Sequence, residues 1–399
     1  ELFPFAVMTG ACFIHGHKSI NYQYAKALGG KMVNMNDFKT LIRYQGEVHE
    51  MEKFFEKDPA LKKVYDQFLD MNLCKNGTDG DISLKEYAAA ESKGNTTDRS
   101  YDFIYKATAN VWGGDWSQLS LKGMLEMDKE LVDFISDEKD PGDFENYLIE
   151  PPLNQLEILK KTFQPLLSEV KLNTRVVEIC YDSKEIILKD QNGQSYTADA
   201  VILTIPLAIL KKGTVRFNPA LPQKKLEAIE KLGMGSGGKV FVKFKKNLWG
   251  DAWKFLNDGF ISLYAATGRL QGKDNNTVIE GFVKDQESEI LRNASKERQK
   301  ELLKKDLGGF FGEDAFDENY EDHVYFGWES VPDISGAYSY PAVGNAADLR
   351  KDLKESIGKK LYFAGEATDC DGYSQSVSGA YSSGKRAAEE VLNDLDSNQ

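Results

Sequence analysis

Three glycines and one carboxylate near the C-terminus stand where a flat ligand could approach the backbone. Gly365 and Glu366 follow a short apolar run, and Gly379 and Gly384 lie early in a predicted helix over residues 378–395. Glycine within a helix costs about 1 kcal/mol relative to alanine, so two of them indicate something large close to the backbone. A helix N-terminus also offers unpaired N–H groups and a partial positive charge. This order of elements suits a flat, partly anionic cofactor, and tight helix packing explains the same residues equally well.

The elements that position these residues follow from the hydrophobic pattern. The run Ala198–Ile205 is apolar, as is typical of a strand buried on both faces, and Pro206 ends it. A second apolar run, Leu361–Ala364, is expected to be a buried strand. Asn192-Gly193 indicates a hairpin turn. The other expected elements are helices over residues 153–167 and 220–233, strands over 175–179, 185–189 and 239–244, and a mostly helical stretch from about 35 to 150.

Length and composition set broad limits on function. A chain of 399 residues with 41% hydrophobic residues is expected to form two interleaved domains with a substantial core. Its net charge of −13 argues against nucleic-acid binding and suits a small cationic partner. Neither a CxxC pair nor an HExxH motif occurs, so no metal site is predicted. No apolar run approaches about 18 residues, so no membrane span is expected.

Residues 233–238 form a literal GxGxxG motif, which we do not interpret as a phosphate loop. A dinucleotide fingerprint needs a strand before the glycines and a helix after them. Here the predicted helix precedes the glycines and the strand beginning at Lys239 follows them. We expect a tight connection whose backbone passes close to a ligand.

Residues 79–86 resemble the second half of an EF-hand calcium loop. Aligning Gly80 at the sixth position of that loop puts Lys75 and Gly77 at positions that need oxygen ligands. Because one ligand position would carry a positive charge, a surface turn is the better interpretation.

The C-terminal pattern FAGEAT, GA, SG and AA resembles the flavin-binding motif of the flavin-dependent amine oxidases, most closely that of the polyamine oxidases. The resemblance implies an α/β (α+β) fold in which an FAD-binding Rossmann-like domain interleaves with a substrate domain of mixed sheet plus helices. It also implies that Gly365 and Glu366 contact FAD, and that Val377, Ser378 and Gly379 point backbone N–H groups at the flavin ring. The positive end of that helix would favour negative charge on the ring.

Lys239 is the residue that the resemblance makes catalytic. By its position alone, a lysine that starts a strand is a solvated strand end. The segment GGKVFVKF, however, resembles the family segment whose first lysine hydrogen-bonds through a water to flavin N5. There the lysine can support imine hydrolysis and reoxidation of the flavin by dioxygen. Lys243 and Lys245 fall later in the motif and are less favoured.

The resemblance also implies a substrate tunnel. Trp328 and Tyr338 match the family's W…GxYS segment, in which the tryptophan packs by the flavin and the second aromatic residue forms a tunnel wall. Such a wall would hold an amine by cation–π attraction. His15 matches the histidine of an IHG motif at the tunnel. The opposite wall aligns with Ser376, and Tyr373 could substitute for it because the loop is about one residue longer here.

Four further positions are implied to contact the cofactor through the backbone. Gly10 and Ala11 would approach the flavin, Val176 matches the position that meets the adenine, and Thr204 belongs to a T-x-P motif after the apolar run. No cysteine stands at the place where monoamine oxidases attach their flavin, because Ala337 occupies it. The resemblance therefore implies non-covalent FAD.

The predicted domains exchange segments along the chain. The FAD-binding domain is expected to comprise residues 1–30, 151–235 and 345–399, and the substrate-binding domain residues 31–150 and 236–344. The family opens with a βαβ unit carrying GxGxxG, whereas VMTGACFIHG here resembles the stretch that follows that unit. We therefore expect the N-terminal βαβ to be absent from residues 1–399 and this polypeptide to bind FAD weakly.

Polyamine oxidation is the function that the resemblance implies. A secondary amine would pass hydride to flavin N5, water would cleave the resulting imine, and O2 would be reduced to H2O2. The partners would be a small cationic amine and O2. The alternatives are another flavin amine oxidase, such as an L-amino-acid or monoamine oxidase, and a non-catalytic scaffold with a flavin fold. A cytoplasmic location is favoured, and the N-x-S/T sequons at Asn76, Asn95, Asn276 and Asn293 leave secretion open.

Overall fold

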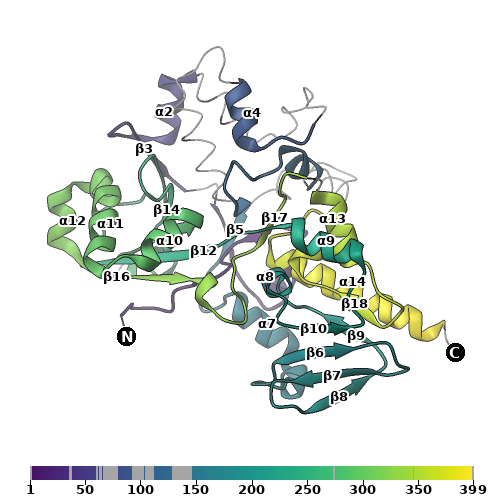
Figure 1. The fold of residues 1–399 in the computed structure, drawn as a ribbon. Helices are drawn as coiled ribbons and strands as arrows, with labels where there is room; N and C mark the ends of the chain where they lie inside the picture. The colour runs from purple at the N-terminus through teal and green to yellow at the C-terminus, as the bar shows by residue number, and fades with distance from the viewer. Residues whose placement is uncertain are drawn as a thin grey trace.

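The fold is taken from a computed structural model of the chain (Figure 1). The structure describes residues 2–35, 38–59, 62, 65, 80–91, 103, 112–127, 146–272, 275–344 and 346–397. The EF-hand-like motif begins before Gly80, so its first half, together with Asn76 and Asn95, lies outside the described residues.

A seven-stranded sheet forms one half of the molecule. Its strand order is β16-β12-β15-β14-β13-β3-β4. The bounds are β16 Tyr320–Gly327, β12 Gly237–Phe244, β15 Val278–Lys284, β14 Leu263–Ala265, β13 Lys254–Asn257, β3 Thr40–Tyr44 and β4 Glu47–Glu50. Strand β12 runs antiparallel to both neighbours, and β13 runs parallel to β3. This sheet therefore joins segments that are about 200 residues apart in sequence, and it carries the strand that begins with Gly237 and Lys239.

Three helices pack on one face of that sheet: α10 (Asp285–Asn293), α11 (Lys296–Phe311) and α12 (Glu313–Asn319) (Figure 1). Buried Leu291, Leu307 and Phe316 from these helices meet Val240 and Val242 of β12 in one apolar cluster. Alternation along β12 leaves Lys239 and Phe241 on the other face.

The other half of the molecule contains two smaller sheets. The four-stranded sheet has the order β10-β6-β7-β8, with bounds β10 Arg216–Asn218, β6 Val176–Cys180, β7 Ile186–Asp190 and β8 Ser195–Ala198. The two-stranded parallel sheet joins β18 (Leu361–Phe363) to β9 (Val201–Leu203). Around them lie α8 (Leu207–Lys212), α9 (Gln223–Lys231), α13 (Ala346–Lys354) and α14 (Val377–Asp396). The long helix α14 reaches the C-terminal end of the described chain (Figure 1).

Short strands bring the N-terminal segment between the two halves. Strand β1 (Ile14–His15) pairs with β5 (Asn146–Ile149), which also pairs with β2 (Met32–Asn34). Strand β11 (Gly233–Met234) pairs with β17 (Ser339–Tyr340). Among the described residues, the remaining helices are α1 (Ile20–Ala27), α2 (Met51–Lys57), α4 (Leu84–Glu91), α7 (Gln155–Phe163) and the 3-10 helices η4 (Gln164–Glu169), η5 (Thr267–Gln271), η7 (Trp328–Ser330) and η8 (Glu366–Thr368).

Most expected elements after residue 150 are confirmed, including the hairpin, whose Gly193 has φ +81°. The expectation of a mostly helical stretch from 35 to 150 is wrong for residues 40–50, which form β3 and β4 because Thr40-Leu-Ile-Arg-Tyr44 favours an extended backbone. The apolar run Ala198–Ile205 is also not one fully buried strand. It is divided between β8 and β9, and the Ile202 side chain of β9 is exposed.

The glycine-rich connection at residues 233–238 has the expected order, since α9 precedes it and β12 follows it. Its glycines approach protein backbone. A Cβ on Gly235 would lie 2.1 Å from the carbonyl oxygen of Gly113, and one on Gly238 would lie 1.8 Å from that of Phe326. Within the described residues, close packing of backbone on backbone explains these glycines.

Two expected absences and one sequon concern the part of the chain that the structure describes. No described helix is both long and apolar enough to cross a membrane. Among the same residues, no group of three acidic, histidine or cysteine side chains is arranged to hold a metal ion. Asn276 is buried and its Oδ1 accepts a hydrogen bond from Trp249 Nε1 at 3.2 Å, which is unsuited to a glycan acceptor. The division into two domains stays a prediction.

Candidate active site

Lys239 lies at the centre of a buried polar cluster. Its side chain is 6% exposed, and Nζ donates to Met8 O at 3.1 Å, to Cys12 Sγ at 3.1 Å and to Glu280 Oε2 at 3.3 Å. An ammonium group has three N–H donors, so these three acceptors match its capacity. The ring of Phe282, the residue opposite Lys239 in β15, lies 4.9 Å from Nζ. The alternative interpretation of Lys239 as a solvated strand end is therefore wrong.

The electrostatics of the cluster follow from its burial. Burial raises the pKa of the Cys12 thiol to about 11, against the opposing effect of the Lys239 charge. Burial also raises the pKa of Glu280, again opposed by Lys239. Burial lowers the pKa of Lys239, but Cys12 and Glu280 more than offset it, so the pKa ends above its ordinary value. The cluster therefore combines a thiol that burial keeps protonated with the Lys239–Glu280 ion pair, whose Nζ and Oε2 are 3.3 Å apart.

Trp328 also contacts the N-terminal segment of residues 8–12, to which Lys239 donates at Met8 and Cys12. Its indole Nε1 donates to Thr9 O at 2.8 Å, and a Cβ on Gly10 would lie 3.2 Å from the indole ring. Phe326, the partner of Lys239 in β16, packs edge-on against Trp328 with ring centroids 5.1 Å apart. Lys239 and Trp328 therefore fix the backbone of residues 8–12 together.

The Glu366 carboxylate joins strand β17 to the loop before α14. Oε1 accepts from the Ser339 N–H at 3.0 Å, and Oε2 accepts from Ser339 Oγ at 2.7 Å and from the Gln375 N–H at 2.9 Å. Behind them, buried Arg350 donates from Nη1 to Ser339 Oγ at 3.0 Å. The Gln375 amide in turn donates to Ser339 O at 2.7 Å. Charge-assisted bonds of this kind hold the segment around Tyr338 against the start of α14.

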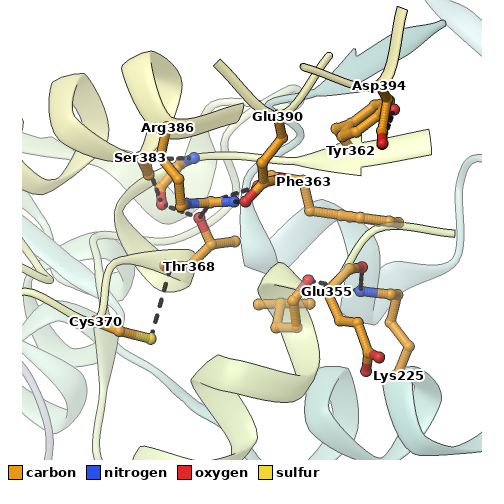
Figure 2. Close-up of polar contacts among 12 residues, drawn as sticks. Lys225, Glu355, Tyr362, Phe363, Thr368, Cys370, Ser383, Arg386, Glu390 and Asp394 are labelled. Atoms are coloured by element: carbon orange, nitrogen blue, oxygen red, sulfur yellow. Dashed lines mark hydrogen bonds and ion pairs between the residues drawn. The ribbon is translucent and has the colours of Figure 1, made fainter. Parts of the chain in front are cut away.

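Figure 2 shows how α14 is fixed against β18 and η8. Arg386 donates to Phe363 O at 2.7 Å and to Thr368 Oγ1 at 3.2 Å, while its other nitrogen pairs with Glu390 at 2.9 Å. One turn further on, Tyr362 OH donates to Asp394 Oδ2 at 2.8 Å. These contacts set the axis of α14, and with it the direction of its N-terminus.

The first turn of α14 is closely packed. Ser376 caps the helix by accepting the Gly379 N–H at 3.1 Å, and Ser378 Oγ donates to Asn21 Oδ1 at 2.5 Å. A Cβ on Gly379 would lie 2.2 Å from Tyr373 O. Gly379, which was predicted to face a ligand, therefore has a packing role: its lack of a side chain lets the Tyr373 backbone lie against the helix. Ser376 serves as a cap in this structure, and a role in a tunnel wall stays a prediction.

Tyr338 directly precedes Ser339, the residue that Glu366 binds, and its ring packs on a glycine. A Cβ on Gly113 would come within 2.1 Å of its ring, so the ring rests on glycine backbone. Burial raises the pKa of its hydroxyl, with smaller contributions from Asp285 and Glu366. Tyr373 is also buried, on the helix side of the Glu366 loop.

His15 extends from β1 toward β5. Its Nδ1 and Asn146 Oδ1 are 2.5 Å apart, and its ring stands edge-on to Phe13. Burial lowers the pKa of His15, with Asn146 opposing the shift. Phe13 stacks on Phe282, so His15 connects through one aromatic ring to the Lys239 cluster.

Three further expected positions lie at two different sheets. Thr204 follows β9, and Gly365 follows β18, so both lie at the same edge of the parallel pair. Val176 begins β6 in the four-stranded sheet.

Two members of the Lys239 cluster were not expected from the sequence. Glu280 stands in the apolar strand VIEGFVK, and a lone acid in such a strand was the available signal. The sequence gave no such signal for Cys12, because a free cysteine is commonly buried in an apolar stretch without any functional role.

A cavity of about 290 Å³ opens beside this cluster. Both Cys12 and Glu280 contribute to its wall, and Glu280 is the carboxylate among its described lining residues. Trp253 lies in the same wall, and its buried Nε1 has no hydrogen-bond partner among the described residues. The other walls are mainly apolar, with Met8, Phe13, Leu148, Ile149, Leu153, Ala265 and Leu270 among them.

Three of the residues predicted to contact a flavin leave their backbone open to a flat ring. Gly365 has φ +119°, and no other atom lies within 4 Å of where its Cβ would be. Ala11 and Thr204 are exposed, so a flat ring could meet their backbone. The positive end of α14, a helix of 20 residues, begins beyond the Glu366 loop. In this structure the Glu366 carboxylate is engaged by protein donors, and its contact with a flavin stays a prediction.

Comparison with known proteins identifies similar sequences among the plant polyamine oxidases. The chain is 31% identical to polyamine oxidase 4 of Oryza sativa subsp. japonica over 230 residues, which are 56% of this chain and 45% of that protein. It is 31% identical to polyamine oxidase 2 of Arabidopsis thaliana over 231 residues, which are 56% of this chain and 44% of that one. The alignments thus span about half the length of these curated relatives.

A solved structure shows the same fold. Wild-type putrescine oxidase bound to putrescine superimposes with a TM-score of 0.78 at 17% identity, covering 98% of this chain and 90% of that one. The family model for flavin containing amine oxidoreductases matches residues 9–392. The chain belongs to the family of flavin-containing amine oxidoreductases.

Proposed function

We propose that the protein oxidises a polyamine or a similar cationic amine, with non-covalent FAD as cofactor and O2 as electron acceptor. The observation that carries the proposal is the cavity beside Lys239, in which one buried carboxylate faces mainly apolar walls. An alkyl amine needs apolar surface for its methylene groups and negative charge for an ammonium group. The net charge of −13 adds a long-range attraction for cations.

The residues of the chain have separate tasks in this proposal. Gly365, Ala11, Thr204 and the start of α14 would hold the flavin ring, and Trp328 would fix the segment on which the ring rests. When bound, the flavin would accept a hydride from the carbon next to the amine nitrogen and pass the electrons to O2, giving H2O2. The apolar walls would exclude bulk water until the imine is released for hydrolysis.

Glu280 sets the preference for cations. Its carboxylate is 5% exposed and its partner is Lys239, so the pair is neutral as a whole. A positively charged amine entering the cavity would find the carboxylate at its wall and the ammonium group behind it. Such a site favours an amine with a second charged nitrogen over a neutral or carboxylate-bearing substrate.

A substrate panel tests the proposal. We expect turnover with spermine, spermidine or putrescine and none with L-leucine, measured as H2O2 release from the FAD-loaded protein. Glu280→Gln should raise KM for polyamines at least about tenfold, because roughly 1.4 kcal/mol of charge attraction is lost. Turnover of L-amino acids in preference to amines would contradict the proposed substrate class, and turnover of neither would favour a scaffold.

A further inference from the structure

Cys12 is a buried nucleophile for which the proposed reaction has no use. Its Sγ lies 3.1 Å from Lys239 Nζ, and the residue is 7% exposed. The Lys239 side chain is 6% exposed, and Glu280 Oε2 lies 3.3 Å from the same nitrogen. A sulfur, an amine nitrogen and a proton acceptor are thus held in contact in a dry environment.

The cavity gives a small oxidant access to this contact. Cys12 and Glu280 both line the cavity of about 290 Å³, which is large enough for several water-sized molecules. Hydrogen peroxide is of that size. The half-buried Cys180 lies 4.0 Å from Asn218 Nδ2, which is an amide nitrogen and not nucleophilic, and the half-buried Cys370 donates to Thr368 O at 3.9 Å.

We propose that peroxide converts the Cys12–Lys239 contact into a covalent sulfenamide bond between Sγ and Nζ, which switches off the site. The bond itself requires only peroxide. Its role as feedback on the enzyme rests on the proposed function, in which peroxide is the product.

The chemistry balances in two steps. In the first, the Cys12 thiol reduces H2O2 to water and becomes a sulfenic acid, so sulfur loses two electrons. In the second, Glu280 accepts a proton from the Lys239 ammonium, and the neutral amine attacks the sulfenic sulfur. The S–N bond forms as the S–O bond breaks, and the hydroxyl leaves as water with a proton from the amine. Overall, one thiol, one amine and one H2O2 give one sulfenamide and two waters.

The surroundings make this a response to accumulated peroxide. Burial holds the thiol in its neutral form, and a thiol reacts with peroxide far more slowly than a thiolate. Once sulfenic acid forms, the neighbouring amine competes with further oxidation because it is already in contact. Two equivalents of an added thiol would return Cys12 and Lys239 and leave a disulfide of the reductant.

The consequence for the site follows from what the linkage removes. Nζ would lose its positive charge and keep a single N–H, so it could hold at most one of its bonds to Met8 O and Glu280, and Glu280 would lose its charged partner. The segment 8–12 would be tied to β12 by the S–N bond, and Lys239 would no longer offer a free amine to the site. The linked form should therefore lose at least about 90% of its amine oxidase activity until it is reduced.

Peptide mass spectrometry on the full chain tests the linkage. After treatment with H2O2, the peptides that contain Cys12 and Lys239 should be joined, with a mass about 2 Da below the sum of the free peptides. Dithiothreitol should separate them. Cys12→Ser should abolish the joined species, whereas the matched variant Cys370→Ser should retain it.

Two outcomes would overturn the proposal. One is Cys12 oxidised to sulfinic or sulfonic acid with Lys239 unmodified, and the other is Cys12 unreacted after Cys180 and Cys370 have oxidised. Glu280→Gln gives a second check, because it removes the proton acceptor. It should lower the yield of joined peptide at least about fivefold and leave sulfenic acid that a dimedone probe can trap. The linkage is read without amine turnover, so its failure and the failure of the proposed function are separate results.

Discussion

Lys239 and Glu280 lie diagonally across β12 and β15, with Nζ and Oε2 3.3 Å apart and both side chains no more than 6% exposed. They lie on the sheet face opposite the helices α10, α11 and α12, under residues 8–12. The pair therefore serves two purposes: it anchors the N-terminal segment, and it places one carboxylate at the wall of a cavity.

Breaking this pair should destabilise the fold strongly. Lys239→Met leaves the Glu280 carboxylate buried without a partner, which costs about 3–5 kcal/mol. The double variant Lys239→Met with Glu280→Leu should recover at least about half of that loss, because no unpaired charge remains. Urea unfolding of the two single variants and the double variant measures the coupling. Equal stability of Lys239→Met and the natural chain would show that the pair contributes nothing.

Lys239→Met should also remove most turnover. The variant is expected to keep bound flavin, because the ring contacts proposed here come from Gly365, Ala11, Thr204 and α14. Unchanged steady-state kinetics with an unchanged rate of reaction with O2 would refute a catalytic role. Lys243→Met is the matched control. Lys243 lies on the same strand as Lys239, is partly exposed, and forms an ion pair at 2.9 Å with Glu321 of the neighbouring strand β16.

Glu366→Gln tests whether the carboxylate holds strand β17, at Ser339, against the Gln375 loop. A glutamine keeps the shape but turns one acceptor into a donor that faces N–H and O–H groups, which should cost about 2 kcal/mol. The same replacement at exposed Glu355 should change the unfolding free energy by less than about 0.5 kcal/mol. Similar effects at the two positions would contradict the assigned network.

Gly379 and Gly384 form a matched pair on α14. Gly379→Ala would put a methyl group 2.2 Å from Tyr373 O, so the start of α14 must shift and stability should fall by at least about 2 kcal/mol. Nothing lies within 4 Å of the corresponding point at Gly384, and Gly384→Ala should stabilise the helix by about 0.5–1 kcal/mol. Thermal unfolding of the two variants measures both changes in stability, a decrease for Gly379→Ala and an increase for Gly384→Ala. A destabilised Gly384→Ala would mean that another group occupies that space.

Stability should fall with acid because of His323. Its Nδ1 lies 2.6 Å from Tyr320 OH and its Nε2 lies 2.9 Å from Gln299 Oε1, which suits a neutral ring. Burial lowers its pKa to about 4, with Lys296 adding to the shift. Since the unfolded chain binds this proton near pH 6.5, stability is full above that value and declines as the pH falls to 4, by about 2–3 kcal/mol in total.

The check is the slope of unfolding free energy against pH for the natural chain and His323→Gln. The variant should have a clearly smaller slope between pH 6.5 and 4, because glutamine takes up no proton there, and the part that remains belongs to other buried groups such as His15. A slope as large in His323→Gln as in the natural chain would contradict the assignment to His323.

The local elements were largely predictable because their signals are local. Strand β12 and helix α14 follow from the period of their apolar residues, and the hairpin follows from Asn192-Gly193. Strands β3 and β4 were missed because Thr40–Tyr44 is short and is completed by β13, which lies more than 200 residues further along the chain. Pairing over such a distance leaves little trace in the sequence around residue 40.

The site was predictable where a motif carried it and unpredictable where tertiary contacts made it. Lys239, Trp328 and Glu366 were singled out by motifs, and the structure brings the first two to the same segment through Met8 and Thr9. The sequence offered no sign that Ser339 and Gln375 would occupy the Glu366 carboxylate. Nor did it show Cys12 beside Lys239, since their contact depends on how residues 8–12 cross the sheet.

The most direct test of the central claim is the absorbance spectrum of the protein purified with its natural N-terminus, before and after anaerobic addition of spermine. The account predicts flavin bands that bleach on addition of spermine and return when air is admitted. Flavin bands that stay unchanged with spermine and putrescine would contradict polyamine oxidation, and a protein without flavin bands would contradict the cofactor assignment.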